Sequence, residues 1–299
     1  MRSSSRVLII DLLVERAEFG HGGNQEVIKP LVALSDVQVL LVTPQMQSFE
    51  EENSINSDPE IKLTKSDVPN WDHEYDFWDE KDVEIGGKSV NFKRILMPMH
   101  KDEREMKKWI IDLELNAVVC SGSRRNVSMW EDWMSPTETM LRIAAKSGIP
   151  TLGICFGHQL LCHSLGSQVE RATSFSSGIW NLELTKEGMN DVLLTSHVEY
   201  NENISGLFSH QDHVMSIPNS CTLLSKTDHN MITAIRVNDK SGNPMPAWGI
   251  QFHPEAARKR IERAYGWGHI SEEEYKSFKG EHDGAKILES FANIVLEKM

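Results

Sequence analysis

One cysteine of the chain lies between two glycines, in the segment PTLGICFGHQLLCHSLG (150–166). Cys155 stands where a short apolar run gives way to a helical pattern, with Gly153 and Gly157 two residues away on either side. This is the cysteine counterpart of the G-x-S-x-G turn, in which a strand passes sharply into a helix and small residues let the backbones approach. Such a turn would put the sulfur at a helix start, where the helix dipole favours thiolate over thiol. Cys155 is therefore a candidate nucleophile, and a buried thiol in a glycine-rich turn is the alternative.

A candidate base for this thiol is His253, in the segment AWGIQFHPE (247–255). An apolar strand ends at this histidine, and Pro254, which cannot donate to a strand ladder, marks the end. On an extended segment, side chains two residues apart point the same way. Glu255 could then accept a hydrogen bond from one imidazole nitrogen while the other nitrogen faces the thiol. The spacing predicts a Cys-His-Glu triad, and a helix that simply begins after the strand, with His253 incidental, is the alternative.

Two backbone amides are candidates for stabilising the oxyanion that attack by a thiolate would create. One is the N–H of Phe156, which directly follows the candidate nucleophile. The other is expected from a glycine loop at the end of a neighbouring strand, and VVCSGSRRN (118–126) supplies such a loop around Gly122. An ordinary strand-ending turn is the alternative interpretation of this loop.

These residues must be positioned by a sheet, and the chain opens with a β-α-β pattern. Two β-branched runs are separated by a helix-like stretch that begins near Asn24, which indicates a parallel sheet with a right-handed crossover. The segment 135–148 predicts a helix, with Pro136 in its first turn and Gly148 at its end. The predicted buried strands are residues 6–11, 37–43, 116–122, 149–155 and 247–252.

The interval from about 45 to 105 differs from the rest of the chain in composition. It is acidic at first, then acidic and aromatic together, and it includes two alternating segments around Gly86 and Gly87 that predict a β-hairpin. We interpret it as an insertion or lid within a single domain of residues 1–299, and a solvated loop with one hairpin is the alternative. From about 256 to 299 the pattern predicts a largely helical C-terminal tail.

Composition limits the class of partner and the compartment. The 299 residues carry a formal net charge of −13. This charge argues against nucleic acid or an anionic membrane as the main partner, because both need a basic face. No apolar run approaches the ~20 residues that cross a bilayer. Asp11 and Glu15 interrupt the apolar stretch near the amino terminus, which predicts a first strand and not a signal peptide. The four cysteines lack CxxC spacing, which predicts reduced thiols in a cytoplasmic protein.

Two motifs together resemble the class I glutamine amidotransferase family. They are GICFGHQ (153–159) and, about a hundred residues later, GIQFHPE (249–255). The loop SGSRRN (121–126) is similar to the oxyanion strand of that family, and SHQD (209–212) is similar to its glutamine loop. The resemblance covers most of the chain except the interval 45–105. It implies a flavodoxin-like α/β fold, with a central, mostly parallel sheet flanked by helices and an inserted segment. It also implies hydrolysis of the glutamine side-chain amide through a γ-glutamyl thioester.

The resemblance implies a role for each matching residue. Cys155 would be the nucleophile, His253 the general base and then acid, and Glu255 the residue that orients the imidazole. The remaining implied residues are Gly122 and Phe156 for the oxyanion, and Gln159 with the backbone of Ser209 and Gln211 for the α-amino and α-carboxylate groups of the substrate.

The chain departs from the family pattern at two places. After Gly122 many members have Gly-Pro or Ser-Pro, whereas this chain has Arg124 and Arg125 close to the expected pocket. A fixed guanidinium fork at Arg124 could recognise a substrate carboxylate, and surface arginines are the alternative. Relatives often carry Gly where Gln211 stands, so the loop around it could approach the substrate differently.

Neither a cofactor nor a metal is predicted. His210 and His213 around Asp212 could suggest a metal, but no third ligand has matching spacing. Nothing in the chain resembles an ATP-pyrophosphatase or synthase module, so any ammonia acceptor must be another chain that carries the synthase activity. A stand-alone hydrolase or peptidase for γ-glutamyl conjugates is the alternative enzyme. A binding protein on an inactivated scaffold is the third hypothesis, and the intact Cys, His and Glu disfavour it.

Overall fold

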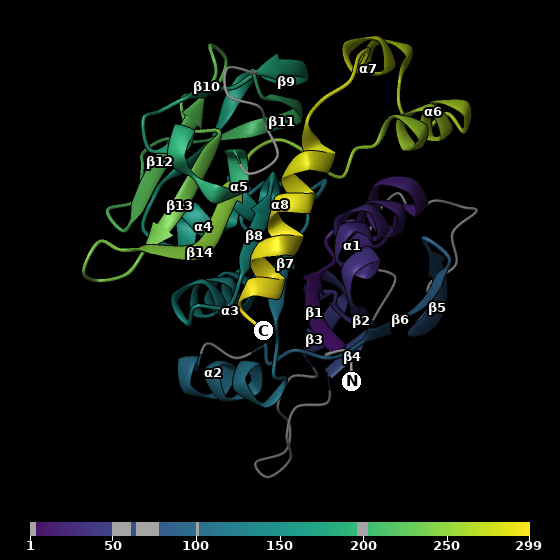
Figure 1. Cartoon of the computed structure of the whole chain (residues 1–299), viewed down its shortest axis with the longest axis vertical. Helices are drawn as coiled ribbons and strands as arrows, with labels where there is room; N and C mark the ends of the chain where they lie inside the picture. The colour runs from purple at the N-terminus through teal and green to yellow at the C-terminus, as the bar shows by residue number, and fades with distance from the viewer. Residues whose placement is uncertain (1–3, 50–60, 64–77, 100–101, 196–202) are drawn as a thin grey trace.

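The computed structural model describes residues 4–49, 61–63, 78–99, 102–195 and 203–299 (Figure 1). Its largest feature is a ten-stranded sheet with the order β10-β12-β13-β14-β8-β7-β1-β2-β6-β5. The strands are β1 (Ser4–Ile10), β2 (Asp36–Val42), β5 (Glu80–Ile85), β6 (Lys88–Arg94), β7 (Ala117–Cys120), β8 (Thr151–Ile154), β10 (Glu183–Leu184), β12 (Cys221–Lys226), β13 (Ala234–Asn238) and β14 (Pro244–Ile250).

The middle of this sheet is parallel and its two ends are antiparallel. Each strand from β14 through β8, β7, β1 and β2 to β6 pairs in parallel with the next. The spatial order β2-β1-β7-β8-β14 is the 2-1-3-4-5 order of the flavodoxin-like fold. The structure therefore confirms the α/β fold class and all five strands predicted from apolar runs.

Helices cover both faces of the sheet (Figure 1). On one face, α1 (Gly22–Leu34) and α8 (Gly284–Glu297) share a hydrophobic core with Val7 and Ile9 of β1. On the other face lie α2 (Glu103–Asp112), α3 (Met134–Lys146) and α4 (Phe156–Ser164), in a second core with Leu8 and Ile10. Successive residues of β1 alternate between two buried faces, which is why the strand is apolar along the part that both cores cover.

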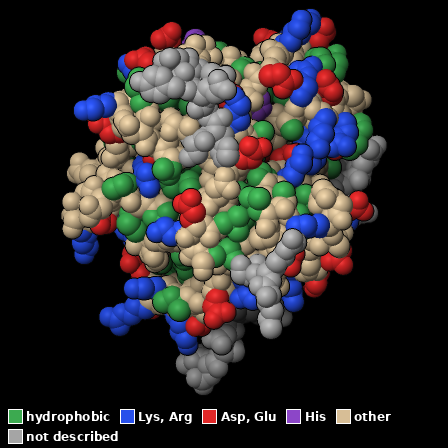
Figure 2. All heavy atoms as spheres, viewed as in Figure 1, with side chains coloured by type: hydrophobic (Ala, Val, Ile, Leu, Met, Phe, Trp, Pro, Cys, Tyr) green, Lys and Arg blue, Asp and Glu red, His purple; other side chains and the backbone are tan. Residues whose placement is uncertain are grey.

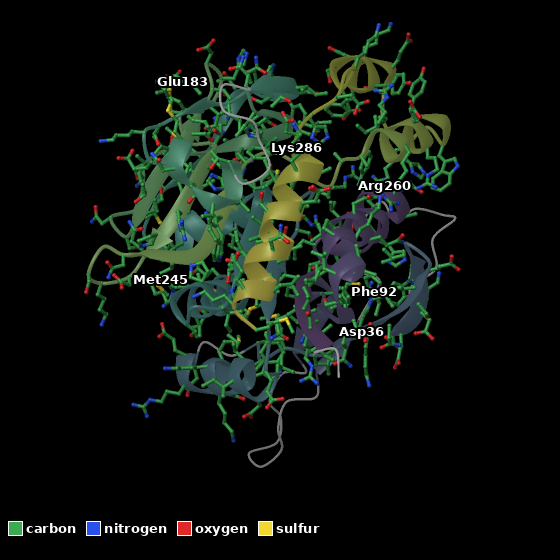
Figure 3. The ribbon with its side chains drawn as sticks, viewed as in Figure 1. Asp36, Phe92, Glu183, Met245, Arg260 and Lys286 are labelled. Atoms are coloured by element: carbon green, nitrogen blue, oxygen red, sulfur yellow. The ribbon has the colours of Figure 1, made fainter. Side chains whose placement is uncertain are left out.

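The hairpin predicted around Gly86 and Gly87 is β5–β6, which turns through positive φ angles of 59° and 80° at the two glycines. Because β6 pairs with β2, the hairpin extends the sheet and does not cover it as a lid. Phe92 of β6, labelled in Figure 3, is fully buried in the core that α1 also joins. Much of the remaining interval from 45 to 105 lies outside the described residues, so the insertion there stays a prediction.

The other elements lie outside the large sheet. The long strands β9 (Val169–Asn181) and β11 (Ser205–Val214) pair as a separate antiparallel ribbon. The remaining elements are β3 (Gln47–Phe49), β4 (Ile61–Leu63), the π-helix η1 (Ala17–His21), the 3-10 helices η2 (Pro44–Met46) and η4 (Gly188–Asn190), and the α-helices α5 (Val192–Thr195), α6 (Arg258–Gly266) and α7 (Glu272–Ser277).

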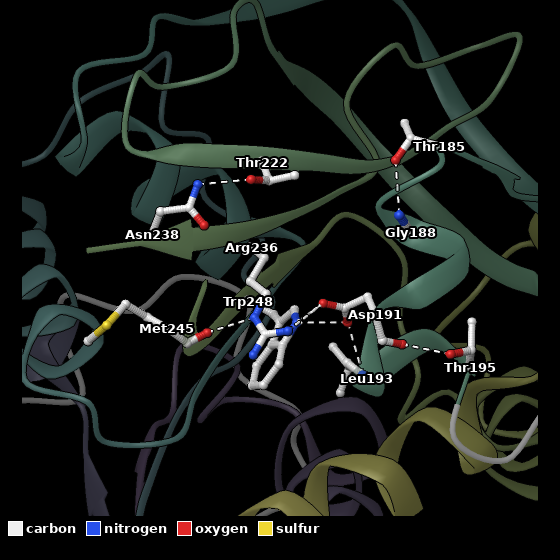
Figure 4. Close-up of polar contacts among 10 residues, drawn as sticks. All are labelled: Thr185, Gly188, Asp191, Leu193, Thr195, Thr222, Arg236, Asn238, Met245 and Trp248. Atoms are coloured by element: carbon white, nitrogen blue, oxygen red, sulfur yellow. Dashed lines mark hydrogen bonds and ion pairs between the residues drawn. The ribbon is translucent and has the colours of Figure 1, made fainter. Parts of the chain in front are cut away.

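Asp191 joins the antiparallel side of the sheet to α5 (Figure 4). Its buried carboxylate accepts hydrogen bonds from Trp248 Nε1 and Arg236 Nη1, each at 3.0 Å, and from the N–H of Leu193 at 2.9 Å. Hydrogen bonds to an ionised acceptor are the stronger kind. Since Trp248 lies on β14, this network holds the strand that leads directly to His253.

The surface carries charges of both signs. On the face that Figure 2 shows, Lys and Arg side chains are interspersed with Asp and Glu side chains. The excess negative charge is therefore not gathered in one patch on that face. Within the described part of the chain, no helix combines the length and the apolar character that crossing a membrane requires.

Candidate active site

The candidate nucleophile Cys155 sits in a strained turn between β8 and α4. Its φ of 50° and ψ of −101° lie in a region that residues with a side chain rarely adopt. A Cβ atom on Gly153 would come within 2.6 Å of the Gly157 carbonyl oxygen, and one on Gly157 within 2.4 Å of the Cys120 carbonyl oxygen. A side chain at either position would therefore clash with the backbone of a neighbouring segment. This is the reason for the two glycines that the elbow pattern predicts.

His253 and Glu255 form a hydrogen-bonded pair next to this turn. The backbone N–H of His253 donates to the Leu207 carbonyl at 2.7 Å, which ties the segment after β14 to β11. The His253 Nδ1 atom lies 2.8 Å from Oε1 of Glu255, so the ring donates to the carboxylate. The extended backbone thus places the two side chains on one side, as the i, i+2 spacing predicts.

The imidazole of His253 also lies beside the thiol. Both side chains line the same pocket, and the charge of Cys155 acts on the imidazole. Gly122 lies against both residues, because a Cβ atom there would be 2.8 Å from Cε1 of His253 and 3.7 Å from Cβ of Cys155. The Cys155 Sγ is 3.9 Å from the Ser209 carbonyl oxygen, within range of a weak S–H donor. Four segments that are far apart in the sequence therefore meet around one sulfur atom.

Electrostatics favour a protonated imidazole at this position. Burial by itself lowers the pKa of His253, but the charges of Cys155 and Glu255, with their hydrogen bonds, raise it well above the ordinary 6.5. A protonated ring at this position can give its proton to a leaving group. The arrangement can therefore hold a nucleophilic sulfur and a proton donor side by side.

The start of α4 contributes to the same centre. Phe156 is the first residue of this helix, so its backbone N–H is one of the amides without an acceptor inside the helix. The Phe156 ring is buried and stacks on Trp133, with the ring centroids 5.8 Å apart. This stacking orients the first turn of α4. The amide of Phe156 thus follows Cys155 directly in the chain, and Gly122, just after β7, lies against the Cys155 side chain.

A pocket of about 420 Å³ opens at this centre. The sequence-predicted residues that line it are Cys155, Phe156, His253, Glu255, Gln159, Ser209, Gln211 and Arg124. Gly122 adjoins them through its contact with His253. The structure brings all the predicted residues together, while the role of each stays a prediction.

The side chains of two residues predicted to bind substrate, Gln159 and, through its backbone, Gln211, already have partners in the protein. The Gln159 Nε2 donates to the Asp212 carbonyl at 2.9 Å and to Gln251 Oε1 at 3.1 Å. The Gln211 Nε2 donates to the Ala172 carbonyl at 3.0 Å. These side-chain nitrogens hold the pocket wall, so substrate contacts in this region would fall mainly to backbone groups.

Residues 121–128, which include the expected oxyanion amide of Gly122, are called the oxyanion loop. Its two arginines differ in their surroundings. Arg124 is exposed at the pocket edge, and its charge acts on the buried carboxyl group of Glu15. Arg125 pairs with Glu131, with Nε 3.5 Å from Oε1. A fork for a substrate carboxylate stays a prediction for Arg124.

Residues for which the sequence predicted no catalytic or substrate-binding role complete the pocket. They are Leu13, Arg16, Glu18, Phe19 and Gly23 from the region after β1, Ser123 and Asn126 of the oxyanion loop, Phe175, Leu207, His210 and Asp212 from the β9–β11 ribbon, and Ala256, Ile261, His269, Ile270, Glu274 and Phe278 from the segment between β14 and α8. The first group follows the carboxyl end of β1, and ligands bind at the carboxyl ends of the strands in such sheets. Its position after a predicted parallel strand could therefore have indicated that it lines the pocket. The last group carried none, because the tail contacts the pocket only through tertiary folding.

Of the two histidines considered as metal ligands, His210 is engaged through its Nδ1 atom. His210 Nδ1 donates to the Asp212 carbonyl at 3.0 Å, and burial lowers the pKa of His210 to about 3. Both carboxylate oxygens of Asp212 accept hydrogen bonds from Ser128. Among the residues the structure describes, no group of three or more His, Cys, Asp or Glu side chains is arranged for a metal ion.

Solved structures share this fold. A glutamine amidotransferase from Thermotoga maritima aligns over 98% of each chain, with a TM-score of 0.57 and 16% identity. A glutamine amidotransferase from Methylobacillus flagellatus aligns over 100% of this chain and 94% of its own, with a TM-score of 0.56 and 14% identity. At such identities the likeness concerns the fold alone, an α/β sheet of the glutamine amidotransferase type.

The sequence comparison defines the family. The model of the class-I glutamine amidotransferases matches residues 83–265, which is more than half of the chain. The protein therefore belongs to the class I glutamine amidotransferase family, as the paired motifs predict.

Individual relatives match over shorter stretches. One is a subunit of the glutamine-hydrolyzing GMP synthase of Methanocaldococcus jannaschii, 33% identical over 115 residues, covering 38% of this chain and 55% of the relative. The corresponding subunit from Saccharolobus solfataricus is 28% identical over 168 residues, covering 56% and 78%. The match to the glutamine-hydrolyzing GMP synthase of Clostridium kluyveri covers 36% of this chain and 19% of that protein. The chain thus spans about half of the first relative and about a fifth of the last.

Proposed function

We propose that this protein hydrolyses the side-chain amide of glutamine to glutamate and ammonia through a thioester on Cys155. The observation that carries the proposal is the strained turn at Cys155 with His253 beside it and Glu255 2.8 Å from the His253 Nδ1. Membership of the class I family supports it independently. Thiolate, imidazole and carboxylate are the parts that nucleophilic acyl transfer requires.

In the first half of the reaction, the Cys155 thiolate attacks the amide carbon of glutamine. The carbonyl oxygen becomes an oxyanion, which the backbone amides of Gly122 and Phe156 stabilise. His253 gives its proton to the amide nitrogen, the C–N bond breaks, and ammonia leaves with the thioester formed.

In the second half, His253 takes a proton from a water molecule that attacks the thioester carbon. The resulting tetrahedral intermediate uses the same two amides, and its collapse breaks the C–S bond. Glutamate leaves and the thiolate–imidazolium pair is restored. Glu255 keeps the ring oriented through both halves.

We further propose that the ammonia passes to a synthase on a separate chain. The names of two relatives, which are both subunits of glutamine-hydrolyzing GMP synthases, support this division of labour. The alternative activity, hydrolysis of γ-glutamyl conjugates by a stand-alone enzyme, gains no support from these relatives.

The test is ammonia and glutamate release from glutamine by the purified protein, with a γ-glutamyl dipeptide assayed in parallel. Cys155→Ala should lower turnover by about 10³-fold or more, because one member of a triad is removed. Cys221→Ala is the matched control, since this thiol lies on β12, and it should leave turnover unchanged. A thiol-alkylating chloroketone analogue of glutamine should label Cys155, as located by mass spectrometry. Brisk dipeptide cleavage with inert glutamine would contradict the proposal.

A further inference from the structure

Asp212 is a buried carboxylate whose two oxygens bind a single residue of the oxyanion loop. Its Oδ2 accepts from the backbone N–H of Ser128 at 2.8 Å, and its Oδ1 accepts from the Ser128 hydroxyl, also at 2.8 Å. The residue is only 1% exposed. Hydrogen bonds to a buried acceptor are strengthened by the low dielectric of the interior, so these two bonds hold Ser128 against β11.

The backbone carbonyl of Asp212 binds two further residues that lie at the pocket. It accepts from Gln159 Nε2 of α4 at 2.9 Å and from His210 Nδ1 at 3.0 Å. The pairing of β11 with β9 shifts register between His210 and Asp212, which leaves Gln211 in a bulge. Asp212 thus connects the helix after Cys155 with the bulge on β11.

Asp212 holds the oxyanion loop, which contains Gly122. At its beginning, the Ser121 N–H donates to the Ile10 carbonyl at 3.1 Å, and the Ser121 hydroxyl accepts from the N–H of Leu12 at 2.9 Å. At its end, Ser128 is bound by Asp212. The loop between them therefore has two fixed points, one on the β1 side of the sheet and one on the ribbon.

We propose that Asp212 is a positioning residue, which holds the oxyanion loop in a fixed relation to α4 and to the Ser209–Gln211 segment of β11. This inference rests on the proposed glutamine hydrolysis. Amides that are held in place before the reaction stabilise an oxyanion without reorganising, whereas a loose loop must be ordered in each turnover. The effect of Asp212 is exerted through Gly122 and the pocket wall, and not by contact with the reacting atoms.

The kinetic test compares Asp212→Ala, Asp212→Asn and Ser128→Ala with the exposed control Asp132→Asn. Removing one oxyanion donor costs about 10²–10³ in kcat, so a loosened loop in Asp212→Ala should cost about 10- to 100-fold in kcat. We expect a smaller change in KM. Asp212→Asn keeps one acceptor oxygen and should recover part of the loss. Asp132→Asn should match the wild type.

Two further readouts separate positioning from general damage. An aldehyde analogue of glutamine forms a tetrahedral adduct with the thiol, and its affinity should fall in parallel with kcat in Asp212→Ala. Alkylation of Cys155 by iodoacetamide needs no oxyanion hole and should stay within about twofold of the wild-type rate. An unchanged kcat in folded Asp212→Ala would overturn the proposal, and so would an equal loss of alkylation rate and kcat.

Hydrogen–deuterium exchange tests the same role without any turnover. The backbone amides of residues 123–128 should exchange faster in Asp212→Ala than in the wild type or Asp132→Asn. If Asp212→Ala does not fold, Ser128→Ala and Asp212→Asn carry the comparison. Unchanged exchange in these variants overturns the positioning role. The two proposals can fail separately. If the wild type releases no ammonia and forms no aldehyde adduct, glutamine hydrolysis is contradicted. If residues 123–128 still exchange faster in Asp212→Ala than in the wild type, the loop contact is supported.

Discussion

Glu255 binds the imidazole of His253 through one of its two carboxylate oxygens. Oε1 lies 2.8 Å from the His253 Nδ1, whereas Oε2 is buried and accepts no hydrogen bond from the described residues. Gly23 at the start of α1 leaves room for the side chain, since a Cβ atom there would lie 3.2 Å from the Glu255 Cγ. The carboxylate is therefore aimed at the ring by packing as well as by hydrogen bonding.

The Glu255→Gln variant should lower the pKa of His253. Gln can still accept from Nδ1, but the negative charge that opposes the effect of burial is gone. In the folded wild type the ring stays protonated above pH 6.5, the ordinary pKa of histidine. This proton donor is lost as the pH rises through the raised pKa. In the variant this alkaline loss of activity should move to lower pH, with kcat/KM reduced by about 10²–10⁴-fold.

An NMR titration of the His253 ring and the pH profile of kcat/KM measure this effect. The control is Glu297→Gln, which removes one carboxylate charge at the end of α8 and leaves Glu255 in place. A ring pKa in Glu255→Gln equal to that of the wild type would rule out the electrostatic role of the carboxylate.

At the scale of elements, the turn between β8 and α4 depends on glycine positions where backbone atoms pack together without a side chain between them. α4 packs so closely on β7 that a methyl group on Gly157 would meet the carbonyl oxygen of Cys120 at 2.4 Å and its Cβ at 2.8 Å. Neither group is the end of a flexible side chain, so α4 itself would have to move. A shift of this helix would carry the Phe156 amide and the sulfur away from His253.

Gly157→Ala should therefore lower both stability and activity. We expect a loss of about 1–3 kcal/mol in the free energy of unfolding, the usual cost of overpacking. Gly266→Ala is the control, because a Cβ atom at the end of α6 meets nothing within 4 Å. Urea denaturation of the two variants measures the difference. Equal stability of Gly157→Ala and the wild type would show that the elbow tolerates a side chain.

At the scale of the whole molecule, the segment from η1 to α1 near the amino terminus meets α6 beside the pocket. Arg260 of α6, labelled in Figure 3, is 7% exposed in its side chain and lies between Glu18 and Glu26, at 3.3 and 2.9 Å. A Cβ atom on Gly22 would lie 2.2 Å from its guanidinium, so α1 begins with glycine to admit this side chain. Burial raises the pKa of Glu26, but Lys259 and Arg260 outweigh burial and hold it below its ordinary value.

Arg260→Met should destabilise the protein by about 3 kcal/mol or more, because two buried carboxylates lose a partner. Arg263→Ala is the control, since Arg263 also binds Glu18 but its side chain is 50% exposed. Because Arg263 is half exposed and Glu18 keeps its bond to the buried Arg260, this loss should cost about 1 kcal/mol or less. Thermal unfolding of both variants provides the comparison. Loss of stability in Arg263→Ala as large as in Arg260→Met would mean that burial does not govern this network.

The sequence by itself determined the local features of this protein. The apolar runs of β1 and β2 predicted buried parallel strands, because a strand covered on both faces reads as a continuous apolar run. The spacing around Cys155 and between His253 and Glu255 predicted an elbow and an oriented imidazole, because both depend on residues at most two positions apart. Gly86 and Gly87 predicted their hairpin for the same reason.

Only the tertiary structure decided which distant residues share the pocket. Glu18 and Phe278 lie near opposite ends of the chain, and no local pattern links them. The hairpin shows the same limit, because alternation predicted its two strands but not that β6 would pair with β2 and extend the sheet. Nor could spacing reveal that the Asp212 carboxylate binds Ser128. The physical reason is that such contacts form between surfaces which meet only after the strands have ordered themselves in the sheet.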